Sequence, residues 1–162
     1  MLDKSLTLIE VLGLAVTQEI AAHKRYKLFA QRVKNPLVKE KFLSLSREEL
    51  AHQDILYSML KKYTNEDKPP LPKTPPRSDE ISDGDKSLSE IIELAIEKEI
   101  EAKEFYLEAA ELAQDPSGKH LLRYLAVFEE GHEQTLKAEL KSITDYPRWF
   151  DMEGPDIMLV GP

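Results

Sequence analysis

The chain has 162 residues, of which 41% are hydrophobic, enough to form the core of one domain. A formal net charge of -8 argues against nucleic-acid and anionic-membrane partners, and neither a membrane span nor a signal peptide is recognisable, so we expect a soluble cytoplasmic protein. The absence of cysteine excludes disulfides, iron–sulfur clusters and rubredoxin-type iron sites, so any metal must bind to nitrogen and oxygen ligands.

The first half of the sequence predicts a helical hairpin, with helices over residues 7–33 and 36–63. Thr7 and Glu10 have the spacing of a capping box, in which two side chains satisfy backbone N–H groups at a helix start. Asn35-Pro36 marks the turn, because proline disfavours helix at the preceding residue and suits the first turn of the next helix.

Residues 64–86 predict a long crossover, because they contain five prolines and Asp83-Gly84. At roughly 3 Å per residue, this segment can run the length of a helix pair and leave the second and third helices parallel. A linker between two domains is the alternative, but neither hairpin alone can cover its apolar stripe.

The second half repeats the first at an offset of eighty residues without a gap. It predicts helices over residues 87–113 and 117–143, with a capping box at Ser87 and Glu90 and a turn at Asp115-Pro116. The predicted fold is therefore all-α: an antiparallel, ferritin-like four-helix bundle of two hairpins joined by a long crossover, occupying residues 1–143.

The tail, residues 144–162, is too apolar to be freely disordered. We expect it to pack on the bundle or on a partner subunit, and a homodimer is the expected assembly. Its apolar and aromatic residues are Tyr146, Pro147, Trp149, Phe150, Met152 and the run Ile157-Met-Leu-Val160.

Ionisable residues interrupt the apolar face of every predicted helix. The first and third helices carry one glutamate each there, and the second and fourth carry a Glu-x-x-His pair. These six candidate ligands are Glu19, Glu49, His52, Glu99, Glu129 and His132. Because no lysine or arginine shares the stripe, buried carboxylates at these positions require a bound cation.

The six residues are also predicted to lie at one level of the bundle. Glu19 precedes Asn35 by sixteen residues, and Glu49 and His52 follow it by fourteen and seventeen; the spacings around Asp115 are identical. Four carboxylates with neutral histidines balance the charge of two divalent ions. The donor set favours iron or manganese over calcium, magnesium or zinc.

The motif Ala15-x3-Glu19-x2-Ala22-x3-Tyr26, followed by Glu48-Glu49-Leu-Ala-His52, recurs in the second half. With its repeat, it resembles the rubrerythrin family of ferritin-like di-iron carboxylate proteins over about residues 7–143. The resemblance implies two irons, with manganese or a mixed iron–manganese pair as alternatives.

The resemblance also implies a role for each ligand. Glu49 and Glu129 would bridge the metals, and Glu19 and Glu99 would be terminal ligands. His52 and His132 would each bind one metal. Tyr26 and Tyr106, two turns past the terminal glutamates, would hydrogen-bond to ligands or serve as ordinary core aromatics.

Two features depart from the family pattern. Rubrerythrins proper carry an extra carboxylate three residues after the terminal glutamate of the third helix, where this chain has Ala102. The rubredoxin domain is absent too. Peroxidase chemistry by ligand exchange is therefore in question, and electrons would come from an external donor such as a rubredoxin or a flavoprotein.

The resemblance predicts an oxidoreductase that reduces peroxide or oxygen. The alternatives are a ferroxidase or iron-handling protein, a non-enzymatic metal-binding sensor, a metal-free structural bundle and a hydroxylase of an organic substrate.

Other ionisable residues near the motifs are not expected to be ligands. Glu48, Glu130 and Glu133 lie off the helical face that carries the motif and are expected to be solvated. His23 is expected to be a partly buried or surface residue, and His120 to lie far from the metal layer.

Overall fold

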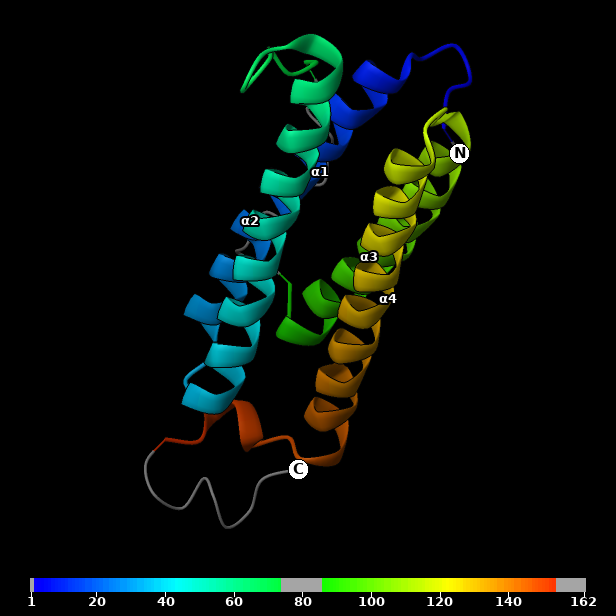
Figure 1. Cartoon of the computed structure of the whole chain (residues 1–162). Coiled ribbons are helices and arrows are strands. Elements are labelled where there is room, and N and C mark those ends of the chain that lie inside the picture. Colours follow the sequence, from blue (N-terminus) through cyan, green and yellow to red (C-terminus); the bar gives the residue numbers. More distant parts are fainter. Residues whose placement is uncertain (1, 74–85, 154–162) are drawn as a thin grey trace.

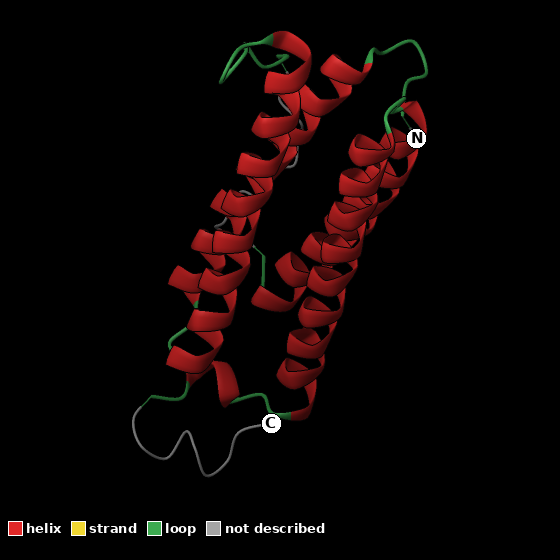
Figure 2. Cartoon of the chain, in the orientation of Figure 1, coloured by secondary structure: helices red, strands yellow, loops and turns green. Residues whose placement is uncertain are grey.

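The computed structural model describes residues 2–73 and 86–153. Within them the chain forms four α-helices, α1 (Leu8–Arg32), α2 (Pro36–Thr64), α3 (Leu88–Leu112) and α4 (Pro116–Asp145), and a short 3-10 helix, η1 (Trp149–Asp151) (Figure 2). The predicted helix bounds agree with these to within two residues. The all-α prediction is confirmed.

The four helix starts use the side chains that the sequence singles out. Thr7 and Ser87 form complete capping boxes with Glu10 and Glu90. Asn35 accepts hydrogen bonds from the backbone N–H groups of Leu37 and Val38, and Asp115 caps α4 in the same way through Gly118.

The helices pack as two hairpins, α1 with α2 and α3 with α4, and α2 runs parallel to α3 (Figure 1). The start of the crossover lies against α1. A Cβ added at Gly13 would lie 2.7 Å from Cδ of Pro72, so glycine permits this close approach. The rest of the predicted crossover, residues 74–85, lies outside the described residues.

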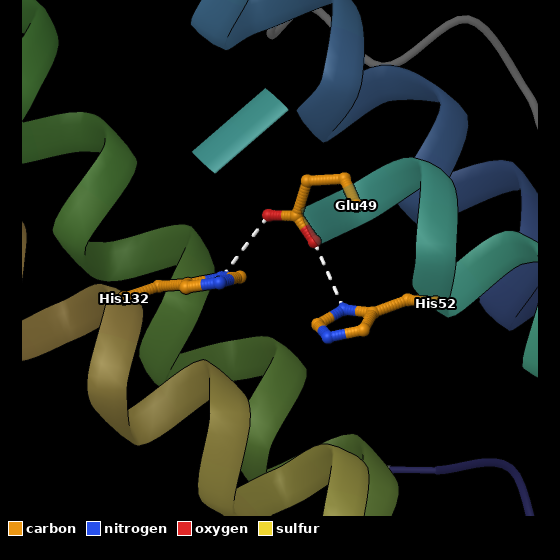
Figure 3. Close-up of side chains that lie close together, drawn as sticks. All are labelled: Glu49, His52 and His132. Carbon is orange, nitrogen blue, oxygen red and sulfur yellow. Dashed lines mark ion pairs between the residues drawn. The ribbon is translucent and has the colours of Figure 1, made fainter. Parts of the chain in front are cut away.

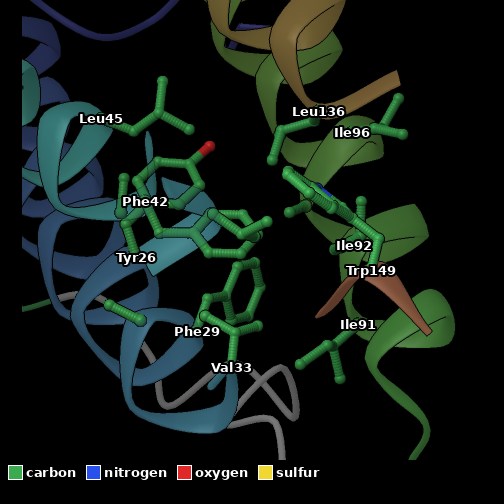
Figure 4. Close-up of a cluster of buried hydrophobic side chains, with 14 residues drawn as sticks. Tyr26, Phe29, Val33, Phe42, Leu45, Ile91, Ile92, Ile96, Leu136 and Trp149 are labelled. Atoms are coloured by element: carbon green, nitrogen blue, oxygen red, sulfur yellow. The ribbon is translucent and has the colours of Figure 1, made fainter. Parts of the chain in front are cut away.

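The apolar core is divided into two clusters, one towards each end of the bundle. One contains Ala22, Leu45, Ile96 and Leu136, together with the aromatic residues in Figure 4. The other contains Val16, Leu56, Tyr106 and Ala126. On each helix, the candidate metal ligands fall between the residues of the two clusters, so the candidate site is a polar layer enclosed by apolar packing.

The first part of the tail closes one end of the bundle. Trp149 is 5% exposed and packs within the cluster shown in Figure 4. Asn35 Nδ2 donates a hydrogen bond of 2.6 Å to the Trp149 carbonyl oxygen, which ties η1 to the α1–α2 turn. The apolar run Ile157-Met-Leu-Val160 lies outside the described residues.

No helix in the described ranges is both long enough and apolar enough to cross a membrane.

Candidate metal centre

The structure brings all six predicted ligand side chains together in the middle of the bundle. Each is between 0% and 3% exposed. One glutamate comes from α1, one from α3, and a Glu-x-x-His pair from each of α2 and α4, because residues three apart share a helix face. The two halves of the sequence repeat therefore contribute equivalent sets of side chains to the site.

The ligand atoms form two overlapping groups of four residues, besides a group of three that contains Glu49, His52 and His132. One contains Glu19, Glu49, His52 and Glu129, and the other contains Glu49, Glu99, Glu129 and His132, with the atoms of each group within 4.8 Å of one another. Glu49 and Glu129 belong to both groups. This is the arrangement expected of two metal positions that share two carboxylates.

The carboxylate of Glu49 faces both histidine rings from one side (Figure 3). Its Oε2 is 3.0 Å from Nδ1 of His52, and its Oε1 is 3.2 Å from Nδ1 of His132. Both rings therefore direct Nδ1 towards the shared carboxylates.

The ring protons of the two histidines are too few to give every carboxylate oxygen in this cluster a hydrogen bond. Each Nδ1 carries at most one proton, yet that of His52 faces Glu19, Glu49 and Glu129 at 3.0–3.3 Å. Both oxygens of Glu49 and Oε1 of Glu129 have no hydrogen-bond partner among the described residues. Buried carboxylate oxygens without partners are costly, so the chemistry of the donor set fits bound cations.

The pKa values reflect the same crowding. Burial, together with neighbouring carboxylates, raises the pKa of Glu49 to about 8 and that of Glu129 to about 7, although the histidines oppose the shift. Burial disfavours the charged form of both imidazoles, but the surrounding carboxylates outweigh it. They raise the pKa of His52 to about 12 and that of His132 well above its ordinary value.

Glu99 differs from the two shared glutamates. Burial again disfavours its charged form, but contacts with His132 and Tyr26 outweigh this and lower its pKa. Glu99 therefore does not share the upward pKa shift of Glu49 and Glu129.

Two buried tyrosines donate hydrogen bonds to the site across the bundle. Tyr26 of α1 donates to Oε1 of Glu99 on α3, and Tyr106 of α3 donates to Oε1 of Glu19 on α1. Burial and the nearby carboxylates raise both tyrosine pKa values well above the ordinary one, so the phenols keep their protons. Both contact candidate ligands directly, as the resemblance implies.

The comparisons with known proteins agree with this geometry. The sequence model of the rubrerythrin family matches residues 10–140, which include all six candidate ligands. The chain belongs to the rubrerythrin family. Among curated proteins, no match is found.

Two solved structures are similar to this rubrerythrin-family chain. A hypothetical protein from Pyrococcus furiosus is 29% identical, with a TM-score of 0.72, over 92% of this chain and 95% of that chain. An uncharacterised conserved protein from Magnetospirillum magnetotacticum is 26% identical, with a TM-score of 0.65, over 85% of this chain and 95% of that chain. The fold of the rubrerythrin-family chain is thus shared over nearly its whole length.

Two of the glutamates expected to be solvated make specific contacts. Glu48 Oε2 lies 2.9 Å from Nε2 of His132, on the side of the ring opposite the cluster. Glu133 is 6% exposed and forms ion pairs with Lys103 and Lys137. The expectation of a solvated side chain is wrong for Glu133, whereas Glu48 keeps a side chain that is 41% exposed and also contacts the site, a contact that the sequence reasoning missed.

The remaining residues outside the predicted ligand set stay outside the site. Glu130 and His120 are exposed. His23 is partly buried, and its Nδ1 lies 2.9 Å from the carbonyl oxygen of Ser46.

Proposed function

We propose that this rubrerythrin-family protein is an oxidoreductase that holds two irons, or an iron–manganese pair, and reduces peroxide or oxygen with electrons from an external donor. The observation that carries the proposal is the pair of four-residue groups that overlap at Glu49 and Glu129. Two equivalent ligand sets with shared carboxylates suit two redox-active ions held side by side.

The donor set supports this choice of metals. Four carboxylates with two neutral imidazoles balance the charge of two divalent ions. Calcium and magnesium rarely take imidazole ligands, whereas iron and manganese accept mixed nitrogen and oxygen ligands. Glu49 and Glu129 would bridge the ions, with Glu19 and His52 completing one position and Glu99 and His132 the other.

The bound ions would supply the two electrons that convert hydrogen peroxide and two protons into two molecules of water. The chain's own residues prepare the site for this reaction. Tyr26 and Tyr106 hold Glu99 and Glu19 in place through their phenol protons. The apolar clusters flank the ligand layer towards the two ends of the bundle and limit the approach of water from those directions.

The reductant must come from outside this sequence. All 162 residues lack cysteine, so the chain holds no iron–sulfur or rubredoxin-type centre of its own. A rubredoxin or a flavoprotein is the class of donor that we propose.

Metal analysis of anaerobically purified protein, followed by titration of the reduced form with hydrogen peroxide and then oxygen, tests the proposal. We expect two metal ions per chain and rapid oxidation by one equivalent of peroxide, with no mineral core. Iron uptake far beyond two ions per chain would instead support iron storage, and failure to retain any metal would refute the proposed centre.

A further inference from the structure

Among the differences between the two halves of the repeat, two place a charged side chain of the first half near a candidate ligand. All six candidate ligands are matched across the offset of eighty residues, but Glu48 corresponds to Phe128 and Arg25 to Phe105. We use "His132 position" for the metal position with Glu99 and His132, and "His52 position" for the one with Glu19 and His52. The ligand sets are equivalent, whereas their surroundings are not.

The imidazole of His132 is held from both sides. Its Nδ1 lies 3.2 Å from Oε1 of Glu49 and 3.2 Å from Oε2 of Glu129, on the side of the shared carboxylates. Its Nε2 lies 2.9 Å from Oε2 of Glu48. When Nδ1 binds a cation, the remaining ring proton is on Nε2 and is donated to Glu48.

The imidazole of His52 has no such acceptor behind it. Its Nε2 is buried and has no hydrogen-bond partner among the residues that the structure describes. Phe128 occupies the repeat-related place, with its ring centroid 5.4 Å from that of His52 and nearly perpendicular to it. An aromatic ring in this place packs against His52 and accepts no conventional hydrogen bond.

The second difference between the halves, Arg25 where the repeat has Phe105, acts through a longer and weaker contact. Nη1 of Arg25 lies 3.9 Å from Oε1 of Glu99, beyond hydrogen-bond distance, so it adds positive charge without orienting the carboxylate. This charge opposes cation binding at the His132 position. Because it comes from a longer contact, we expect the hydrogen bond from His132 to Glu48 to outweigh it.

We infer that Glu48 is a positioning residue that makes the two metal positions unequal, with tighter binding of a divalent ion at the His132 position. The inference rests on the proposed function. A carboxylate that accepts the outer ring proton of a ligating histidine fixes the ring and increases its donor strength, and its loss typically weakens metal binding about 10- to 100-fold.

Glu48 can be replaced without disturbing the core. Its side chain is 41% exposed, and together with His132 it lines a pocket of about 430 Å³ between α2 and α4. A glutamine at this place keeps the size of the side chain and its contact with the pocket. It removes the negative charge that strengthens the hydrogen bond from His132.

The test is titration of metal-free protein with cobalt(II), comparing the wild type, Glu48→Gln and the control Glu130→Gln. Glu130 is exposed and directly follows the ligand Glu129, so the control makes the same chemical change one residue from the site. We expect the wild type and the control to bind two ions with unequal affinities. In Glu48→Gln, the tighter step should weaken about 10- to 100-fold and the other step should change little.

A second measurement assigns the effect to one ring. In the cobalt(II) protein, the imidazole N–H protons give shifted proton NMR signals, and that of His132 should exchange with water faster in Glu48→Gln. The reciprocal variant Phe128→Glu should slow exchange at His52 and strengthen the weaker binding step.

The outcomes separate this inference from the proposed function. If the wild type and the control both bind two ions and Glu48→Gln gives the same binding curve, or weakens both steps equally, the inference is wrong and the metal centre stands. If the wild type does not bind two ions per chain, the proposed centre fails and the inference fails with it.

Discussion

The phenol of Tyr26 on α1 donates a buried hydrogen bond to Glu99 on α3, and so joins one helical hairpin to the other beside the candidate ligands. Tyr106 makes the repeat-related bond to Glu19 in the opposite direction. Because the candidate terminal glutamates are held by tyrosines of the other hairpin, the relative placement of the hairpins and the geometry of the site are coupled.

Tyr26→Phe should lower the free energy of unfolding by about 1.5–3 kcal/mol, the range for hydrogen bonds to charged groups. The ring still fills its place in the core, so the loss reports on the hydroxyl alone. Denaturant unfolding measures it, with Tyr124→Phe, at an exposed position on α4, as the control. A change no larger than that of the control would mean that the bond to Glu99 contributes nothing to stability.

Glu49→Ala and Glu129→Ala should lose metal more completely than Glu19→Ala, because a bridging carboxylate serves both ions and a terminal one serves only one. Metal content after gel filtration measures this, and we expect close to none in the bridging variants and about one ion per chain in Glu19→Ala. Glu130→Ala should keep both ions. Retention of two ions by either bridging variant would refute the ligand assignment.

Ala102→Glu adds a carboxylate three residues after Glu99, on the same face of α3. We expect the native protein to show little change of metal position between oxidation states, because no carboxylate is available there to exchange. The variant should show a larger change, detected by X-ray absorption or by crystal structures of both states. Unchanged metal geometry and unchanged peroxide kinetics would show that position 102 plays no part in the reaction.

The sequence predicts the fold and the candidate ligands because both depend on local rules. Capping residues and prolines set the helix ends, and an apolar stripe with a few buried charges identifies Glu19, Glu49 and their repeats. The side chains at one level meet because hairpins of equal length place them there.

The contacts that the sequence reasoning misses run between helices. Glu48 lies off the apolar face of its own helix, yet it reaches across to His132 on α4. The periodicity of a single helix cannot show this contact. The change from Glu48 to Phe128 across the repeat was the available signal, because a difference beside an otherwise matched site marks unequal surroundings. For Glu133, the i, i+4 spacing to Lys137 was a local signal of pairing.

The metal-free protein should gain stability as pH falls from about 8 to 5. Folding raises the pKa of Glu49 from 4.5 to about 8, that of Glu129 from 4.5 to about 7 and that of His52 from 6.5 to about 12. A group whose pKa is raised on folding contributes stability that is complete below its unfolded-state pKa and is lost as pH rises through its folded-state pKa. Each such group changes the free energy of unfolding by about 1.4 kcal/mol per pH unit within its window. The pKa of Glu99 is lowered on folding, so this residue contributes stability that is lost as pH falls. That loss begins only at a pH more acidic than the range of about 8 to 5.

Bound metal should remove this dependence, because the ligands that take up protons in the metal-free protein are then occupied. Its stabilising effect should shrink towards acid as protons compete for the same oxygens and nitrogens. Thermal melts of metal-free and metal-loaded protein between about pH 5 and 8 measure both effects, and we expect the two curves to converge at the acid end. Glu49→Gln is the matched variant: it removes one titrating carboxylate and should flatten the metal-free profile. If the metal-free and loaded proteins instead show the same pH profile, Glu49 and Glu129 do not share a buried layer that metal occupies.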